Sequence, residues 1–292
     1  MSRTFPALDV SWIDRRDDET VDRLVAEIDD DHPVALESHE RGLRIFFATA
    51  EERHRAEIRL TGSDAGLICT PVDVADEDWA ARSQASLDPV RVGRVVVSPP
   101  WREETRATGD DALVVLIRPS MGFGTGHHAT TRLCLALMQL RPLTGARVLD
   151  VGTGSGVLAL AAWRLGAGMI WALDHDRDSL EAASENLALN AASGSVRLLH
   201  ADIGLEAAAV TAAAPFDLVL ANLTGADLRR HAVRLSQFVA RDGRLVVSGV
   251  LIDEVEDVTE AFEGTGLNAD VRQDEDEWSA LGFTTPTGST TH

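Results

Sequence analysis

Residues 148–157 read VLDVGTGSGV and decide the fold of this 292-residue chain. The pattern is an apolar strand, then a glycine-rich turn, then the start of an apolar helix over residues 157–165. Gly152, Gly154 and Gly156 have no Cβ, so the backbone can turn sharply here and come within contact distance of a ligand. Backbone N–H groups at the start of the helix are expected to face the same place.

The spacing of the three glycines separates two kinds of ligand. A dinucleotide-binding turn reads G-x-G-x-x-G, and the residue at its third glycine position is Val157. A G-x-G-x-G turn after an aspartate-bearing strand instead suits S-adenosylmethionine, which has no pyrophosphate to bind. A strand-to-helix turn without any ligand is the alternative that this motif alone leaves open.

Polar residues are expected at the tips of four successive parallel strands, which share one edge of a sheet. These tip residues are Gly152, Asp174, Asp202 and Asn222. Asp174 stands about 20 residues past the glycines, where a carboxylate accepts hydrogen bonds from both hydroxyls of a ribose. Asp202 would lie near the amino group of an adenine. The alternative for Asp174 is that it only opens the next helix. The sequence therefore predicts a nucleoside site at the carboxyl edge of the sheet.

The chain is strongly acidic, with a formal net charge of −20, and its basic residues are all arginine. Such a charge argues against direct binding to nucleic acid, whose phosphates would be repelled, and favours a basic protein partner. Solubility alone is the other explanation of the acidity.

Other features of the sequence limit the expected cellular location of the protein and the chemistry that it can use. We find no apolar run of about 18 residues and no apolar signal core at the N-terminus, so we predict a cytoplasmic protein that does not enter a membrane. Cys69 and Cys134 lie far apart in the sequence, which fits a reducing compartment. His127 and His128 are adjacent, and adjacent side chains make a poor metal pair, so no metal is expected.

The domain organisation follows from the order of the expected elements. Residues 1–74 read β-α-β-β-α-β, with helices near 18–28 and 51–60, which is typical of a ferredoxin-like α+β domain. A connecting region is expected over 75–111, with one strand at 90–97. A Rossmann-like domain with a mostly parallel seven-stranded sheet is expected over 112–285, and a disordered tail over 286–292.

A second glycine-rich segment precedes the first. Residues 118–131 read RPSMGFGTGHHATT, and a helix is expected directly afterwards. Phe123 would offer an apolar face to the bound nucleoside, and Thr131 would hold the carboxylate or the amino group of its methionine part. The alternatives are a flexible linker and, for the two histidines, a solvated pair.

These motifs together resemble a known family. Three segments, 122–131, 148–156 and 221–223, closely resemble the class I methyltransferases that modify bacterial ribosomal large-subunit protein eleven (the PrmA type). Residues 76–79, 89–94 and 99–101 resemble the family's connecting region, and the likeness covers roughly 75–283. The resemblance implies cofactor contacts at Thr131, Gly152, Asp174 and Asn222. It also implies that the N-terminal domain binds the ribosomal protein.

The resemblance further implies transfer of methyl groups from S-adenosylmethionine to lysine ε-amines, to the N-terminal amine, or to both, by a protein predicted to be a monomer. Asn222 is the predicted catalytic residue, because its side-chain or backbone oxygen can orient the amine, and we see no general base. Gly154, Asp202 and Phe123 complete the predicted cofactor site.

Two departures from the family pattern keep other functions open. Residues 222–228 read NLTGADL where the family usually has NILAGPL, and Thr153 replaces a usual cysteine. A methyltransferase for another protein or a small molecule is the first alternative. A nucleoside-binding module without activity is the second, and a nicotinamide dehydrogenase is a distant third because of Val157.

Overall fold

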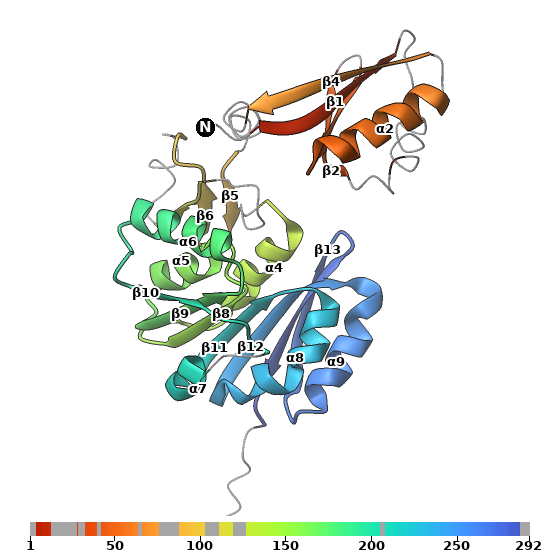
Figure 1. Cartoon of the computed structure of the whole chain (residues 1–292). Helices are drawn as coiled ribbons and strands as arrows, with labels where there is room; N and C mark the ends of the chain where they lie inside the picture. The colour runs from red at the N-terminus through yellow and green to blue at the C-terminus, as the bar shows by residue number, and fades with distance from the viewer. Residues whose placement is uncertain are drawn as a thin grey trace, which may run out of the picture. The chain divides into compact units, whose positions relative to one another are not determined.

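The computed structural model describes residues 4–12, 28, 33–39, 42–63, 66–75, 88–102, 111–118, 127–204 and 208–286. The chain forms two compact units, Met1–Ser86 and Leu87–His292 (Figure 1). The expected first helix (apart from Ile28), the segment 76–79, the loop 119–126 with Phe123, and residues 287–292 of the tail lie outside the described residues.

The N-terminal unit is a four-stranded antiparallel sheet with the order β2-β3-β1-β4, which is the order of a ferredoxin-like sheet. Its described elements are β1 (Thr4–Trp12), β2 (Pro33–His39), β3 (Gly42–Phe47), α2 (Ala50–Ser63) and β4 (Leu67–Ala75).

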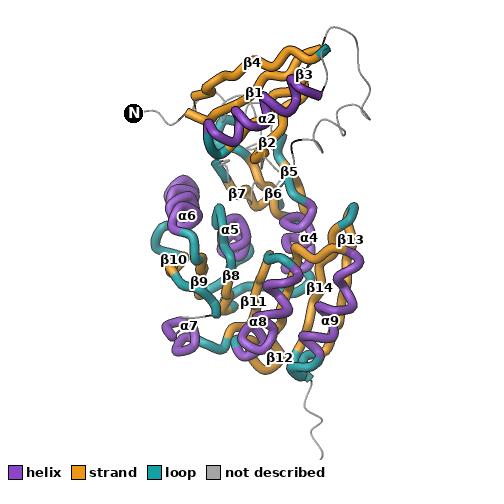
Figure 2. The backbone as a smooth tube through the Cα atoms, turned by 45° about the vertical axis from the view of Figure 1, so that its right-hand side comes forward, coloured by secondary structure: helices purple, strands orange, loops and turns teal. Residues whose placement is uncertain are grey.

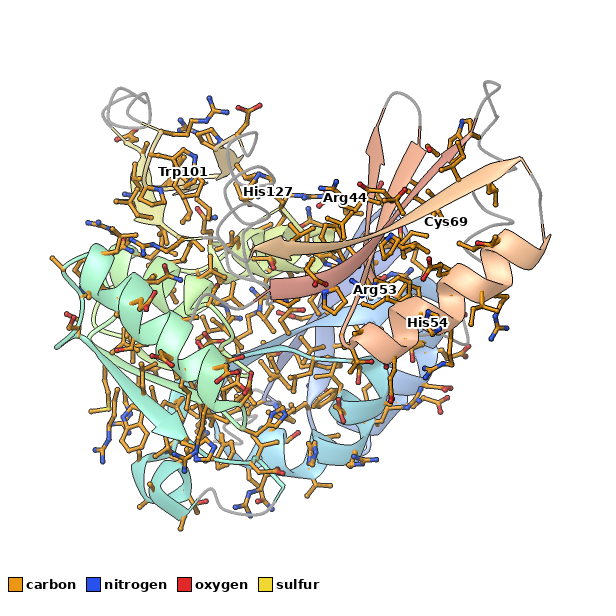
Figure 3. All side chains as sticks on the ribbon, turned by 45° about the horizontal axis from the view of Figure 1, so that its top comes forward. Arg44, Arg53, His54, Cys69, Trp101 and His127 are labelled. Carbon is orange, nitrogen blue, oxygen red and sulfur yellow. The ribbon has the colours of Figure 1, made fainter. Side chains whose placement is uncertain are left out.

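One face of this small sheet carries the core of the unit. Alternate residues of β1 and β3 are buried there with residues of α2, because side chains along a strand point to opposite faces in turn. This cluster contains Leu8, Val10, Ile45, Phe47, Ala56 and Leu60. An ion pair also joins α2 to β4, since Arg53, which is labelled in Figure 3, donates from Nη1 to Asp73 Oδ1 at 2.6 Å.

The C-terminal unit contains a seven-stranded sheet with the order β10-β9-β8-β11-β12-β14-β13. Only β14 runs antiparallel to its two neighbours, so the sheet is mostly parallel, as predicted. Its strands are β8 (Arg147–Val151), β9 (Met169–Asp174), β10 (Val196–His200), β11 (Phe216–Asn222), β12 (Val239–Leu251), β13 (Asn268–Glu275) and β14 (Trp278–Thr284).

Helices cover both faces of this sheet (Figure 2). Val148 and Leu218 face one apolar cluster, whereas their neighbours Leu149 and Val219 face the other, as a doubly covered strand requires. The first cluster includes residues of α4 (Ala129–Met138), α5 (Val157–Arg164) and α6 (Arg177–Leu189). The second includes residues of α7 (Ala208–Ala213), α8 (Gly225–Gln237) and α9 (Val255–Glu263).

The expected connecting region does not form one separate piece. Its second half belongs to the C-terminal unit, where β5 (Val90–Val92), β6 (Val95–Ser98) and β7 (Leu113–Leu116) form a three-stranded sheet. The prediction of a single strand over 90–97 is wrong. Gly93 adopts φ +57°, and a two-residue turn folds the chain into a hairpin. Val95 and Val97 are buried in the first apolar cluster, which explains why this segment packs with the larger unit.

Candidate functional site

The glycine turn has the geometry that only glycine adopts without strain. Gly152, Gly154 and Gly156 have φ values of +70°, +52° and +80°, which L side chains rarely adopt. A Cβ at Gly152 would also stand 2.6 Å from Leu223 Cδ2. The bare Gly152 backbone therefore lets the Leu223 side chain, from the tip of β11, lie directly against the turn.

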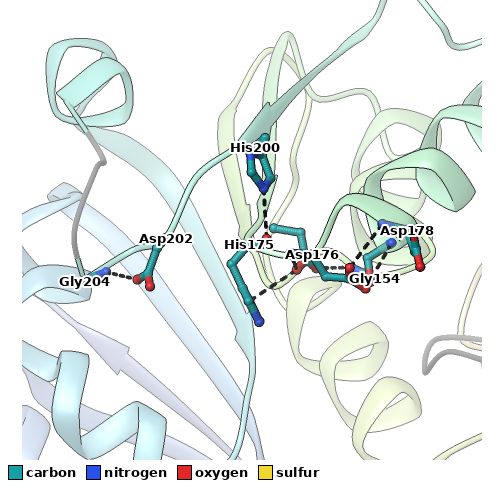
Figure 4. A network of polar contacts seen from close by, with 9 residues as sticks. Gly154, His175, Asp176, Asp178, His200, Asp202 and Gly204 are labelled. Atoms are coloured by element: carbon teal, nitrogen blue, oxygen red, sulfur yellow. Dashed lines mark hydrogen bonds and ion pairs between the residues drawn. The ribbon is translucent and has the colours of Figure 1, made fainter. Parts of the chain in front are cut away.

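Asp174 ties this turn to the tip of β9. Its carboxylate accepts a hydrogen bond from the Gly154 N–H at Oδ2 and one from the Asp176 N–H at Oδ1, both at 3.0 Å. Figure 4 shows Gly154 and Asp176 within this polar network. The side chain is 8% exposed. His175 Nδ1 also lies 3.5 Å from Oδ1, which is too far for a strong hydrogen bond, and an ionised carboxylate accepts about four hydrogen bonds, so each oxygen retains a lone pair for a ligand hydroxyl.

A cavity of about 260 Å³ lies at this carboxyl edge. Gly152, Asp174 and Asp202, which the sequence placed in one site, line it together. Asp202 accepts from the Gly204 N–H at 2.6 Å through Oδ1 (Figure 4). The lining residues are Val151, Gly152, Leu173, Asp174, His175, Ala201, Asp202, Ile203, Leu223, Asp227, Arg230 and His231.

Among the described residues, three predicted site residues do not line this cavity: Thr131, Gly154 and Asn222. Thr131 is buried in the first turn of α4. Gly154 contacts the cavity wall indirectly, through its bond to Asp174. Asn222 is the last residue of β11 and pairs with Ser248 of β12, next to the lining residue Leu223.

Sequence reasoning missed the contribution of α8. Asp227, Arg230 and His231 line the cavity from the first turns of this helix. Their i, i+3, i+4 spacing puts them on one helix face. That polar spacing directly after a predicted strand tip was the signal available in the sequence.

Asp150 is a buried acid beneath the glycine turn, and we assign no ligand contact to it. Its Oδ2 accepts from Thr153 Oγ1 at 2.6 Å and from the Ala159 N–H at 3.2 Å, so it takes one of the α5 N–H groups that the sequence assigned to a ligand. Burial raises the pKa of Asp150 from 3.8 to about 6; the bonds from Thr153 and Ala159 lower that pKa, and the charge of Asp174 raises it.

We expect Asp150 to make the fold less stable as the pH rises. The folded state holds the proton more tightly than the unfolded chain, so the stabilisation present below the unfolded pKa is lost as the pH rises through about 6. The rise from 3.8 to about 6 corresponds to about 3 kcal/mol. Urea unfolding of the wild type and of Asp150→Asn, from about pH 4 to about pH 7, measures this difference. Parallel pH profiles for the two proteins would contradict the prediction.

The cavity has the chemistry of a nucleoside site. Apolar side chains of Leu173, Ile203 and Leu223 line it, and two carboxylates stand at adjacent strand tips. The carboxylates suit hydroxyl and amino donors and repel a pyrophosphate, and the bare glycine turn lets a ligand approach the backbone. These residues fit the adenosine part of S-adenosylmethionine.

A seven-stranded sheet with one antiparallel strand and this site at its carboxyl edge define a class I S-adenosylmethionine-dependent methyltransferase. The sequence profile of the family described as ribosomal protein L11 methyltransferase (PrmA) matches residues 20–286. The chain belongs to this family, and the resemblance drawn from the sequence is confirmed.

Relatives and a solved structure agree with this assignment. The chain is 40% identical over 227 residues to the ribosomal protein L11 methyltransferase of Geotalea uraniireducens, with 72% of this chain and 68% of the relative covered. It is 40% identical over 242 residues to that of Pelobacter propionicus, covering 80% and 76%. The crystal structure of the ribosomal protein L11 methylase from Lactobacillus delbrueckii subsp. bulgaricus superimposes with a TM-score of 0.60 at 26% identity, covering 69% of this chain and all of that one.

Within the described part of the chain, no helix is long and apolar enough to cross a membrane. The described residues also contain no group of three or more His, Cys, Asp or Glu side chains that could hold a metal ion.

Proposed function

We propose that this protein methylates amino groups of ribosomal protein L11, at lysine side chains or at the N-terminus, with S-adenosylmethionine as the methyl donor. The observation that carries the proposal is the carboxylate of Asp174 in an apolar cavity beside the glycine turn, in a chain of this family. The cofactor supplies a methyl group already activated on a sulfonium, so the protein has mainly to position the acceptor.

The acceptor amine is assigned to the tip of β11. A Cβ on Gly249 would stand 3.2 Å from Asn222 Oδ1 and 2.9 Å from the Leu223 carbonyl carbon, and it would overlap the Leu223 carbonyl oxygen. Two acceptor oxygens, one from a side chain and one from the backbone, therefore lie around this glycine. An amine that donates to both would be held with its lone pair in a fixed direction, which is the role we assign to Asn222.

The amine must be neutral before it can accept a methyl group. A lysine with a pKa near 10.4 is mostly protonated at about pH 7, and deprotonation there costs about 4.6 kcal/mol. Contact with the apolar Leu223 side chain would lower this cost, because desolvation disfavours the charged amine. The proton can then leave to water, and no protein base is assigned.

Partner recognition rests on charge and on the separate N-terminal unit. A net charge of −20 favours a basic protein over a nucleic acid, whose phosphates it would repel. We assign binding of the ribosomal protein to the ferredoxin-like unit, and the predicted monomer remains a prediction.

Incubation of the purified protein with tritiated S-adenosylmethionine and ribosomal proteins from a methylation-deficient strain tests this function. Label on a single ribosomal band, absent with the Asp174→Ala variant, is the expected result. Label on another protein, or only on small molecules, would assign a different acceptor. Residues 222–228 depart from the family pattern, and this departure is the reason for testing other acceptors. Cofactor binding without any label would leave a nucleoside-binding module and overturn the proposal.

A further inference from the structure

One buried amide joins two backbone segments that lie far apart in the sequence. Asn186, in the last turn of α6, is 1% exposed. Its Nδ2 donates to the Ser155 carbonyl oxygen at 2.9 Å, inside the glycine turn. Its Oδ1 accepts from the Arg118 N–H at 2.8 Å, just after β7. Both polar atoms of this side chain are therefore engaged, and neither contacts the cavity described above.

A second asparagine, at the C-terminal cap of the same helix, provides a close comparison. Asn190 is 4% exposed, and it lies one turn further along. Its Oδ1 accepts from the Leu116 N–H at 2.9 Å, and its Nδ2 donates to the Leu116 and Asn186 carbonyl oxygens at 2.6 Å and 2.8 Å. Both asparagines fasten the end of β7 to α6, but within the described part of the chain only Asn186 of the two bonds to the glycine turn.

The Asn186 bond engages a carbonyl of a buried turn. Ser155 is buried between Gly154 and Gly156, and glycines populate many backbone conformations. A buried carbonyl that loses its donor costs about 1–3 kcal/mol, so the turn would move to regain one. Two side chains outside the turn therefore bond to its backbone: the Asp174 carboxylate accepts from the Gly154 N–H, and the Asn186 amide donates to the Ser155 carbonyl.

We propose that Asn186 is a positioning residue for cofactor binding, which fixes the backbone of the glycine turn through Ser155 without contacting the cofactor. The inference rests on the proposed function, because it takes this turn as part of the S-adenosylmethionine site. A turn that is already held in its bound conformation loses less entropy when the cofactor binds, so the protein has a higher affinity for the cofactor.

The test compares the variants Asn186→Ala and Asn190→Ala by calorimetry of S-adenosylmethionine binding and by urea unfolding. Both variants should lose stability, since each removes bonds to β7. We expect Asn186→Ala to raise the dissociation constant about tenfold, and Asn190→Ala to change it by less than about twofold. In a methylation assay, the KM for S-adenosylmethionine should rise in Asn186→Ala while kcat changes little.

Asn186→Asp separates the two bonds of this side chain once its carboxyl is ionised, because the carboxylate keeps an acceptor for the Arg118 N–H and has no donor for Ser155, whereas a protonated carboxyl would still donate. If the Ser155 bond carries the effect, Asn186→Asp weakens cofactor binding as much as Asn186→Ala does. Equal affinities in the Asn186 and Asn190 variants would overturn the inference and leave Asn186 a structural residue. A wild-type protein that binds no S-adenosylmethionine would instead overturn the cofactor site itself, so the two failures are distinguishable.

Discussion

Replacement of Asp174 by alanine is expected to raise the dissociation constant for S-adenosylmethionine about a hundredfold. The carboxylate lies in the cavity with a lone pair left on each oxygen, after its bonds to the Gly154 and Asp176 N–H groups. Two ribose hydroxyls would therefore each donate to a charged acceptor, and such bonds contribute about 1.5 kcal/mol or more apiece. Isothermal titration calorimetry measures the change directly.

A matched control lies two residues away. Asp176 caps α6 with an exposed carboxylate, and asparagine caps a helix equally well, so Asp176→Asn removes the same charge without loss of the cap. We expect its affinity to stay near that of the wild type. An S-adenosylmethionine analogue without the ribose hydroxyls should bind weakly to the wild type. Asp174→Ala should bind this analogue no more weakly than it binds S-adenosylmethionine. Unchanged affinity in Asp174→Ala would remove this carboxylate from the ribose.

The site residues that sequence analysis placed together share one property, namely that local pattern alone determines their position. Gly152, Asp174 and Asp202 each follow an apolar strand, and the tips of parallel strands meet at one edge whatever the rest of the chain does. The mostly parallel sheet was predictable for the same reason, since strands alternating with apolar helices have few other ways to pack.

Residues whose role depends on packing could not be placed in the same way. Arg230 and His231 reach the cavity because another face of α8 is buried against the sheet; their polar spacing is visible in the sequence, but the cavity beside that polar face is not. The alternating run at 90–97 reads equally well as one strand, and Gly93 turns it into a hairpin. The bonds of Asn186 join residues 31 and 68 positions away, a separation that no local pattern spans.

Replacement of Gly249 by alanine is expected to lower kcat about a hundredfold, with a much smaller change in cofactor affinity. Gly249 adopts φ +85° at an irregularity in the pairing of β12 with β14, and a Cβ there would overlap the Leu223 carbonyl oxygen and press on Asn222. Backbone and side-chain oxygens that hold the acceptor amine would have to move, and a displacement of about 1 Å at a reacting group costs about a hundredfold in rate. Gly249 is not among the residues that line the described cavity, so the cofactor should still bind.

The variant Gly266→Ala separates the effect of displacing the acceptor oxygens from the effect of backbone strain. Gly266 has φ +93°, so alanine there suffers a similar backbone strain of about 1–3 kcal/mol, but a Cβ at Gly266 meets no atom within 4 Å. Both variants should therefore unfold at lower urea concentrations, whereas only Gly249→Ala should lose turnover. Measured at saturating S-adenosylmethionine, equal kcat values for the two variants would show that the approach of β12 to Asn222 and Leu223 does not position the acceptor. A loss confined to Gly249→Ala would assign the amine to the oxygens of Asn222 and Leu223, since both substitutions strain a positive-φ backbone and only Gly249→Ala adds that collision.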